Sequence, residues 1–537
     1  MPYSGSGSVS LDGGARARRR PRGALGATAL RGGRTWLTRR PSPYVVLGGL
    51  FWVVLTLAYW RVSPCCDSGR YAAVIERLRW DLWHPAHPTA DLPGAGSPAY
   101  SPYAVVQGVV ARLTGLSGWA LVELAGPLNL LVLLTGVGRF VRVLTPRPWA
   151  PVLALLFMTL LWGTERIVWS GHLGLMSMTT TLGHPSTFAI GLTFWAWAWT
   201  GARARGGGLS RGVRYVGPSG LGSAWAYAGL GALYGLIVLT HQVTAVAAAA
   251  GAVALVAAWQ RGWWGPVVGR WALTGAVALA VAVAWPYHGV PAPAGGAGGD
   301  GTHRLLYTGM VGHLWLALLG LPALWARARR SPRDPLVLMF GAQCLVAAYG
   351  WVGGHYAYGG VLGLAAVPAQ VALAVELAAP RPWGRGRRVL GAVAAAGVCV
   401  GFLTVQAGAV VPRSLDPVGF EQPPRPPAYA WAARHVGAGE VLLTDGYVAE
   451  RALPGYGVNM AAPPWPDPAL DEAARRRRYA DVGAYLDPAA TRAERTEIAR
   501  RYGVRWLLLT RWRAVPEEAV VVDWNPRSGE VLARIAP

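Results

Sequence analysis

The stretch just beyond the first apolar block holds the side chains best suited to chemistry. Asp67 stands there, Arg70 follows, and an amphipathic helix that can lie along a membrane surface is expected to run to about Trp83. A carboxylate in this place can act as a general base toward an attacking hydroxyl. It can equally be a solvated loop acid that caps the helix behind it. Both interpretations of Asp67 stay open at this point.

A second carboxylate, Glu165, stands at the end of the third apolar block, and Arg166 follows it. An arginine suits bidentate contact with a phosphate, but an interfacial ion pair or a snorkelling side chain fits the same position. Further candidates to bind a phosphate or a sugar are Arg70, His84, His87, His172, His184, His303, Arg304 and His355. They share one side of the expected topology, which predicts a polar binding or catalytic face, although histidine is also acceptable in any aqueous loop.

The composition is that of a membrane protein. Of the 537 residues, 53% are hydrophobic and 14% are charged, whereas roughly 25% of an average soluble domain is charged. The net charge of +24 comes mostly from arginines between apolar blocks, a pattern of membrane topology that excludes a nucleic-acid partner. The four cysteines are vicinal or stand within apolar blocks, so they form neither a disulfide framework nor a zinc site.

Eleven apolar blocks of helical length predict an all-α bundle that crosses the bilayer about eleven times. The blocks cover about residues 44–62, 119–137, 149–163, 186–200, 227–240, 243–259, 267–285, 305–325, 336–351, 361–377 and 389–411. Several are nearer 15 than 20 residues, which is short for a spanning helix unless neighbours bury it. Glu123 stands inside the second block, where an unpaired carboxylate is costly, and is therefore expected to face protein or a cavity.

Charge asymmetry predicts the orientation of these blocks. Residues 1–43 are rich in Arg, Gly and Ser without an apolar run, which predicts a disordered cationic tail in the cytoplasm. Every second connection from there is also rich in arginine, as the positive-inside bias requires. The transmembrane domain is expected over 44–411, with a first outer loop over 63–118, and an odd number of crossings places residues 412–537 outside the cell.

The last 126 residues change abruptly to a charged, loop-rich composition that predicts a small extracytoplasmic α/β module. Buried strands are expected over residues 440–445 and 504–510, and helices over 475–486 and 491–502. A hairpin of residues 519–523 and 530–535 is expected around the turn at 525–529.

Three short motifs add to Asp67: Ser101-Pro102-Tyr103 leading into the second crossing, Gly183-His184-Pro185-Ser186 opening the fourth, and Leu239-Thr240-His241-Gln242 closing the fifth. With these the chain resembles the GT-C superfamily of membrane glycosyltransferases, including its bacterial mannosyl, arabinosyl and galacturonosyl transferases. The absence of lysine and the codon bias of a high-GC genome fit an actinobacterial type. In those families an acidic residue of the first outer loop is catalytic or binds a metal, and Asp67 matches it.

The resemblance implies an enzyme that takes a sugar from a polyprenyl-phosphate donor and passes it to a glycan, lipid or protein acceptor outside the cell. Asp67 would be the base, Glu165 a second carboxylate, and the outer cationic groups would hold the lipid phosphate. The loop has a single Asp67 rather than an Asp-x-Asp pair, so no cofactor is certain and a divalent metal remains open. The alternatives are a transporter or flippase of a lipid-linked or polar solute, with Glu123 on its path, and a membrane scaffold without activity.

Overall fold

The computed structural model describes residues 41–62, 67–92, 97–206, 220–263, 265–287, 300–380, 384–467 and 469–536. The chain divides into two units, Met1–Ser42 and Pro43–Pro537, and all elements below belong to the second. The expected cationic tail over 1–43 therefore lies almost entirely outside the described residues.

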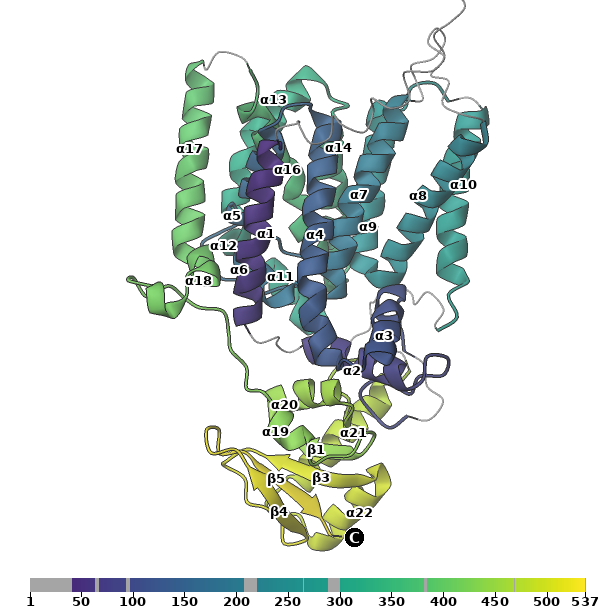
Figure 1. The fold of residues 1–537 in the computed structure, drawn as a ribbon, viewed down its shortest axis with the longest axis vertical. Helices are drawn as coiled ribbons and strands as arrows, with labels where there is room; N and C mark the ends of the chain where they lie inside the picture. Colours follow the sequence, from purple (N-terminus) through teal and green to yellow (C-terminus); the bar gives the residue numbers. More distant parts are fainter. Residues whose placement is uncertain are drawn as a thin grey trace, which may run out of the picture. The chain divides into compact units, whose positions relative to one another are not determined.

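Helices make up most of the second unit (Figure 1). Those that lie in the apolar blocks include α1 (Pro43–Arg61), α4 (Gly118–Leu144), α5 (Ala150–Leu160), α7 (Pro185–Gly206), α8 (Gly220–Thr240), α9 (Gln242–Trp259), α10 (Gly265–Val283), α14 (Pro335–Val352), α16 (Val367–Leu377) and α17 (Arg385–Gly401). Within the described ranges, eight segments are long and apolar enough to cross a membrane: α1, α4, α9, α10, α14, Met310–Arg330, Tyr356–Leu377 and Arg385–Val410. By length and composition this is a multi-pass membrane protein.

The expected count of eleven crossings is not confirmed, although all eleven blocks are helical. Two of the other three are short, since α5 has 11 residues and the apolar part of α8 covers only Ala224–Thr240. The third, α7, has 22 residues but is rich in Trp, Thr and Gly, which makes it less apolar than its neighbours. Its buried face packs against α4 and α9, so protein rather than lipid surrounds much of this helix.

Two blocks that read as single spans are broken helices. The block at 305–325 consists of α11 (Asp300–Thr308), α12 (Met310–Leu314), the 3-10 turn η1 (Trp315–Gly320) and α13 (Leu321–Arg330). The block at 361–377 begins in another 3-10 turn, η2 (Tyr356–Val361), followed by α15 (Leu362–Ala365) and α16. At Gly320 a Cβ atom would lie 2.3 Å from the carbonyl oxygen of Ala369, so the two broken segments touch through their backbones.

Glu123 does not lie where the sequence predicted. It stands in the second turn of α4 and is exposed, while its carbonyl oxygen accepts a hydrogen bond from the indole of Trp60 at 3.2 Å. A carboxylate near the end of a helix can reach the aqueous boundary, so the expectation that Glu123 faces protein or a cavity is wrong.

The first outer loop contains two helices, α2 (Asp67–Trp80) and α3 (Pro102–Thr114). The motif at Ser101 opens α3 rather than the second crossing, because the Ser101 side chain caps α3 by accepting from the Ala104 amide at 3.3 Å. Helix α2 is largely buried instead of lying free along a membrane surface. A Cβ atom at Gly69 would lie 1.9 Å from the carbonyl oxygen of Arg451, and one at Gly118 would lie 2.3 Å from that of Ala72. The C-terminal module and α4 therefore enclose α2 between them.

The C-terminal module contains a mixed five-stranded sheet in the order β2-β1-β3-β5-β4. Its strands are β1 (Val441–Thr444), β2 (Asn459–Met460), β3 (Val504–Leu509), β4 (Ala519–Trp524) and β5 (Val531–Ile535), and its helices are α19 (Ala430–Ala433), α20 (Tyr447–Ala452), α21 (Glu472–Tyr485) and α22 (Arg492–Tyr502). Strand β1 is parallel to β2 and β3, and β5 is antiparallel to β3 and β4. The expected strands, helices and hairpin are confirmed, and the two-residue strand β2 was missed.

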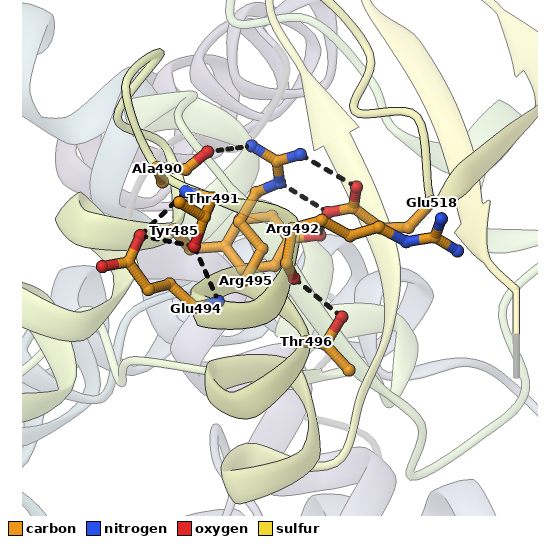
Figure 2. Close-up of polar contacts among 8 residues, drawn as sticks. All are labelled: Tyr485, Ala490, Thr491, Arg492, Glu494, Arg495, Thr496 and Glu518. Carbon is orange, nitrogen blue, oxygen red and sulfur yellow. Dashed lines mark hydrogen bonds and ion pairs between the residues drawn. The ribbon is translucent and has the colours of Figure 1, made fainter.

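Side chains that are close together in the sequence fix the start of helix α22. Figure 2 shows the Thr491 hydroxyl accepting from the Glu494 amide at 3.3 Å, while the Glu494 carboxylate accepts from the Thr491 amide at 2.8 Å. This reciprocal capping box satisfies two amides at the start of the helix. Arg495, one residue further along, donates to Glu518 at 2.7 Å and so fixes α22 to the segment before β4.

Candidate functional site

The first turn of α2 brings two of the predicted residues together. Asp67 is exposed, and its Oδ1 accepts a hydrogen bond from the indole N–H of Trp465 at 2.8 Å. The next residue, Ser68, is buried, and its hydroxyl is hydrogen-bonded to Nε2 of His184 at 2.9 Å. The candidate base thus has the C-terminal module on one side and the start of α7 on the other.

Burial sets the charge of His184. It lowers the pKa of His184 to about 4, and the opposing effect of the nearby Asp67 charge is smaller. The ring packs edge-on to Tyr71 at 4.9 Å between centroids. His184 is therefore a neutral imidazole at pH 7, able to hydrogen-bond Ser68 but unable to provide positive charge.

Two further histidines belong to the same neighbourhood. Burial also lowers the pKa of His241 to about 4, and proximity to His184 and His303 lowers it further. Nδ1 of His241 accepts from the Thr244 amide at 3.3 Å, so the proton of the neutral ring is on Nε2. His303, on α11, is half-buried with its ring 5.5 Å from that of Trp169. Ends of α2, α7, α9 and α11 thus contribute to one polar region.

The buried carboxylate of Asp467, a residue of the module, contacts two other predicted residues. Its Oδ2 accepts from the Ser97 hydroxyl at 2.7 Å and lies 3.6 Å from Nε2 of His87 and 3.7 Å from the Arg70 guanidinium. Burial favours the neutral acid, but these contacts outweigh it and hold the pKa of Asp467 below its usual value. Nδ1 of His87 accepts from two backbone amides, so Nε2, the nitrogen 3.6 Å from Asp467, carries a proton.

Glu165 and Arg166 have other partners. The exposed Glu165 carboxylate lies 3.9 Å from Nε2 of His313, and its amide donates to the Gly312 carbonyl at 3.2 Å, so it rests on α12. Arg166 forms an ion pair with Glu421 at 2.7 Å, with both side chains largely exposed. The contacts of this pair therefore lie apart from those of Asp67.

The four remaining candidates occupy separate positions. His172 is buried against Trp162, with ring centroids 5.1 Å apart, and burial lowers its pKa to about 4. Arg304 is exposed, with its guanidinium 5.8 Å from the centre of the Tyr356 ring. His84 is exposed, and its backbone amide donates to the Asp81 carboxylate. His355 is also exposed, and its ring contacts those of Tyr349 and Tyr358.

Sequence reasoning missed Trp465 and Asp467, two module residues whose side chains contact the candidate residues Asp67 and Arg70 of α2. They stand in a segment rich in proline and tryptophan, residues 461–467, that follows β2, and no spacing rule links it to a loop about 400 positions earlier. Over the described ranges, no group of three or more His, Cys, Asp or Glu side chains is placed to hold a metal ion.

Neither the known family models nor the curated proteins include a match to this chain. Among solved structures, ArnT from Cupriavidus metallidurans in the apo state is 16% identical, with a TM-score of 0.49 over 92% of this chain and 99% of that one. The archaeal oligosaccharyltransferase AglB from Archaeoglobus fulgidus, in complex with an inhibitory peptide and a dolichol-phosphate, is 12% identical, with a TM-score of 0.46 over 87% of this chain and 69% of that one. At these identities and TM-scores, neither comparison assigns a family or an activity to this protein.

Proposed function

We propose that this protein is a GT-C-type membrane glycosyltransferase that passes a sugar from a polyprenyl-phosphate donor to an acceptor on the outer side of the membrane. The observation that carries the proposal is the setting of Asp67. Its carboxylate is exposed to incoming substrate, held by Trp465 and seated beside buried His184. A free but oriented carboxylate is what proton removal from a hydroxyl requires.

In the proposed reaction the acceptor hydroxyl attacks the anomeric carbon of the sugar while Asp67 takes its proton. The bond from that carbon to the phosphate oxygen breaks, and the polyprenyl phosphate leaves with the electron pair. Its negative charge needs cationic donors. His184, His241 and His172 are neutral at pH 7 because burial lowers the pKa of each to about 4. We therefore assign the phosphate to an arginine, with Arg304, the neighbour of His303 on α11, as the candidate.

The decisive experiment uses the full chain in liposomes, supplied with polyprenyl-phosphate mannose, arabinose or galacturonic acid. Transfer of the labelled sugar to a glycan, lipid or protein acceptor supports the proposal. Release of no sugar from any of the three donors, with folded protein in the membrane, would contradict it.

The proposed orientation has the C-terminal module outside the cell and the arginine-rich helix ends inside. Helix α13, whose last turn contains Arg327, Arg329 and Arg330, lies at the end of the bundle away from α2 (Figure 1). There Arg330 pairs with Glu376, and Arg147 donates to the Val375 carbonyl. In a variant whose four cysteines are replaced by serine, we expect Ala489→Cys to react with an impermeant maleimide on intact cells. Arg329→Cys should react only after permeabilisation, and the reverse pattern would overturn the orientation.

Trp465→Phe tests whether the module positions the base. The change keeps an aromatic ring but removes the N–H that donates to Asp67. Without this hydrogen bond the carboxylate is less well oriented toward the acceptor hydroxyl, so kcat should fall while KM for the acceptor changes little. Transfer at pH 7 should fall about tenfold or less. Trp512→Phe is the matched control, since Trp512 is 78% exposed, and an unchanged kcat in Trp465→Phe would exclude the positioning role.

A further inference from the structure

The C-terminal module contains a cavity of about 310 Å³ at the carboxyl ends of the parallel strands β1 and β2. In open α/β sheets this edge is where ligands bind, and cavities of roughly 300–1,000 Å³ take small molecules. The cavity lies on the module itself, in elements other than those that hold Asp67.

The groups that line the cavity suit a neutral, hydroxyl-rich ligand. Leu442, Met460 and Val482 form an apolar wall, while Tyr447, Glu450 and Tyr479 provide polar groups and aromatic rings. The Glu450 carboxylate accepts from the Tyr479 hydroxyl through Oε1, and its Oε2 lies 3.6 Å from the Arg451 guanidinium. A carboxylate oxygen has two lone pairs, so Oε2 can accept a further hydrogen bond from a ligand. Carboxylate oxygens accept hydrogen bonds from sugar hydroxyls, and an aromatic ring packs against the apolar face of a sugar.

An anionic ligand fits less well. Asp445 lines the cavity together with Glu450, and no arginine, lysine or histidine is among the described residues of the lining. Each carboxylate already has an arginine partner outside the lining, Asp445 with Arg513 and Glu450 with Arg451, both at 3.6 Å. An anionic ligand would have to compete with a carboxylate for its arginine, whereas a neutral ligand would not. Asp445 is already engaged, since it accepts from the amide and the hydroxyl of Thr510 at 2.8 and 2.6 Å, which leaves Glu450 as the acceptor for a ligand.

The segment 461–467 connects this cavity to the candidate base. Ala462 lines the cavity, and Trp465, three residues later, donates to Asp67. Three residues of extended chain span at most about 11 Å. An oligosaccharide of a few units can therefore occupy the cavity and Asp67 at the same time.

We propose that the cavity binds a neutral sugar unit of an oligosaccharide acceptor whose free end reaches Asp67. The inference rests on the proposed function and makes it more specific, because it selects a glycan over a lipid or a protein as the acceptor. It adds a binding site on the module, with Tyr447 and Glu450 as the recognising residues.

The test measures binding by isothermal titration to the full chain in nanodiscs. The probes are linear tetrasaccharides of mannose, arabinose and galacturonic acid, with the three monosaccharides. We expect a neutral tetrasaccharide to bind at least tenfold more tightly than its monosaccharide, and the galacturonic acid probe to bind least. Tyr447→Ala and Glu450→Gln should each weaken tetrasaccharide binding about tenfold, while Trp524→Ala, on the exposed strand β4, should not.

The outcomes separate this inference from the proposed function. Absence of tetrasaccharide binding, or binding that survives both cavity substitutions, overturns the inference even if sugar transfer to a lipid or protein is observed. Binding that is lost in both cavity variants supports the cavity site, and if the wild type then transfers no sugar, only the proposed function fails.

Discussion

Asp67→Asn is expected to lower the rate of sugar transfer by on the order of 100-fold or more. The amide keeps the size of the side chain and still accepts a hydrogen bond from Trp465, but it takes no proton from the acceptor hydroxyl. Donor binding should change far less, because arginines rather than Asp67 would hold the lipid phosphate. Both quantities are measurable in the liposome assay, with donor affinity and transfer followed separately.

The control for this substitution is Asp91→Asn, an exposed acid of the same outer loop. It should leave transfer unchanged, since nothing in its position relates it to the candidate base. Full transfer in Asp67→Asn would remove Asp67 from the mechanism. Glu165, which rests on α12 beside His313, would then be the next carboxylate to replace.

Asp467→Ala is expected to destabilise the contact between the module and the first outer loop by about 3 kcal/mol. The change leaves buried His87 and partly buried Arg70 without their shared carboxylate, and it leaves the Ser97 hydroxyl without its acceptor. Denaturant unfolding of the chain in nanodiscs, followed by tryptophan fluorescence, measures the loss. Asp471→Ala is the matched control, because Asp471 is exposed and its side chain does not cap α21.

The pKa of Asp467 also predicts that the stability of the protein depends on pH. The pKa of Asp467 is held below its usual value by its contacts with His87, Arg70 and Ser97, which outweigh its burial. In the unfolded chain the pKa of an aspartate is about 4. Asp467 therefore contributes its full stabilisation above about pH 4, and this contribution is lost as the pH falls through the lower pKa of the folded protein. Acidification below about pH 4 should reduce the stability difference between wild type and Asp467→Ala, and an equal difference at pH 3 and pH 7 would contradict this assignment.

The sequence predicted best what depends on neighbouring residues. A short apolar run predicted β3, the turn residues 525–529 predicted the hairpin of β4 and β5, and the helical stretch over 491–502 predicted α22. The breaks at Gly309 and Gly320 were missed because hydropathy averages over a window and does not register a 3-10 turn. Ser101 was assigned to the second crossing for a similar reason, since a proline after a serine opens any helix, whether or not that helix spans a membrane.

The candidate site was predictable only in part. Asp67 and His184 could be selected because each stands at the end of an apolar block, where polar side chains have few structural roles. Their joint position depends on Ser68, which carries no signal of its own. Trp465 and Asp467 contact α2 through pairings across 398 and 397 positions of the chain, and one sequence without aligned relatives contains no information on such pairings.

The pairing of Asp67 with Trp465 has a consequence for biosynthesis. Ribosomes add roughly 5–20 residues per second, so a growing chain carries Asp67 for roughly 20 to 80 s before Trp465, 398 positions later, has been made. During that interval α2 lacks the surface around Arg451 that covers Gly69 in the finished protein. A chain released early, after its last membrane helix, would insert into the bilayer with an unoriented carboxylate and an uncovered helix, which makes it a substrate for membrane quality control instead of a partly active enzyme.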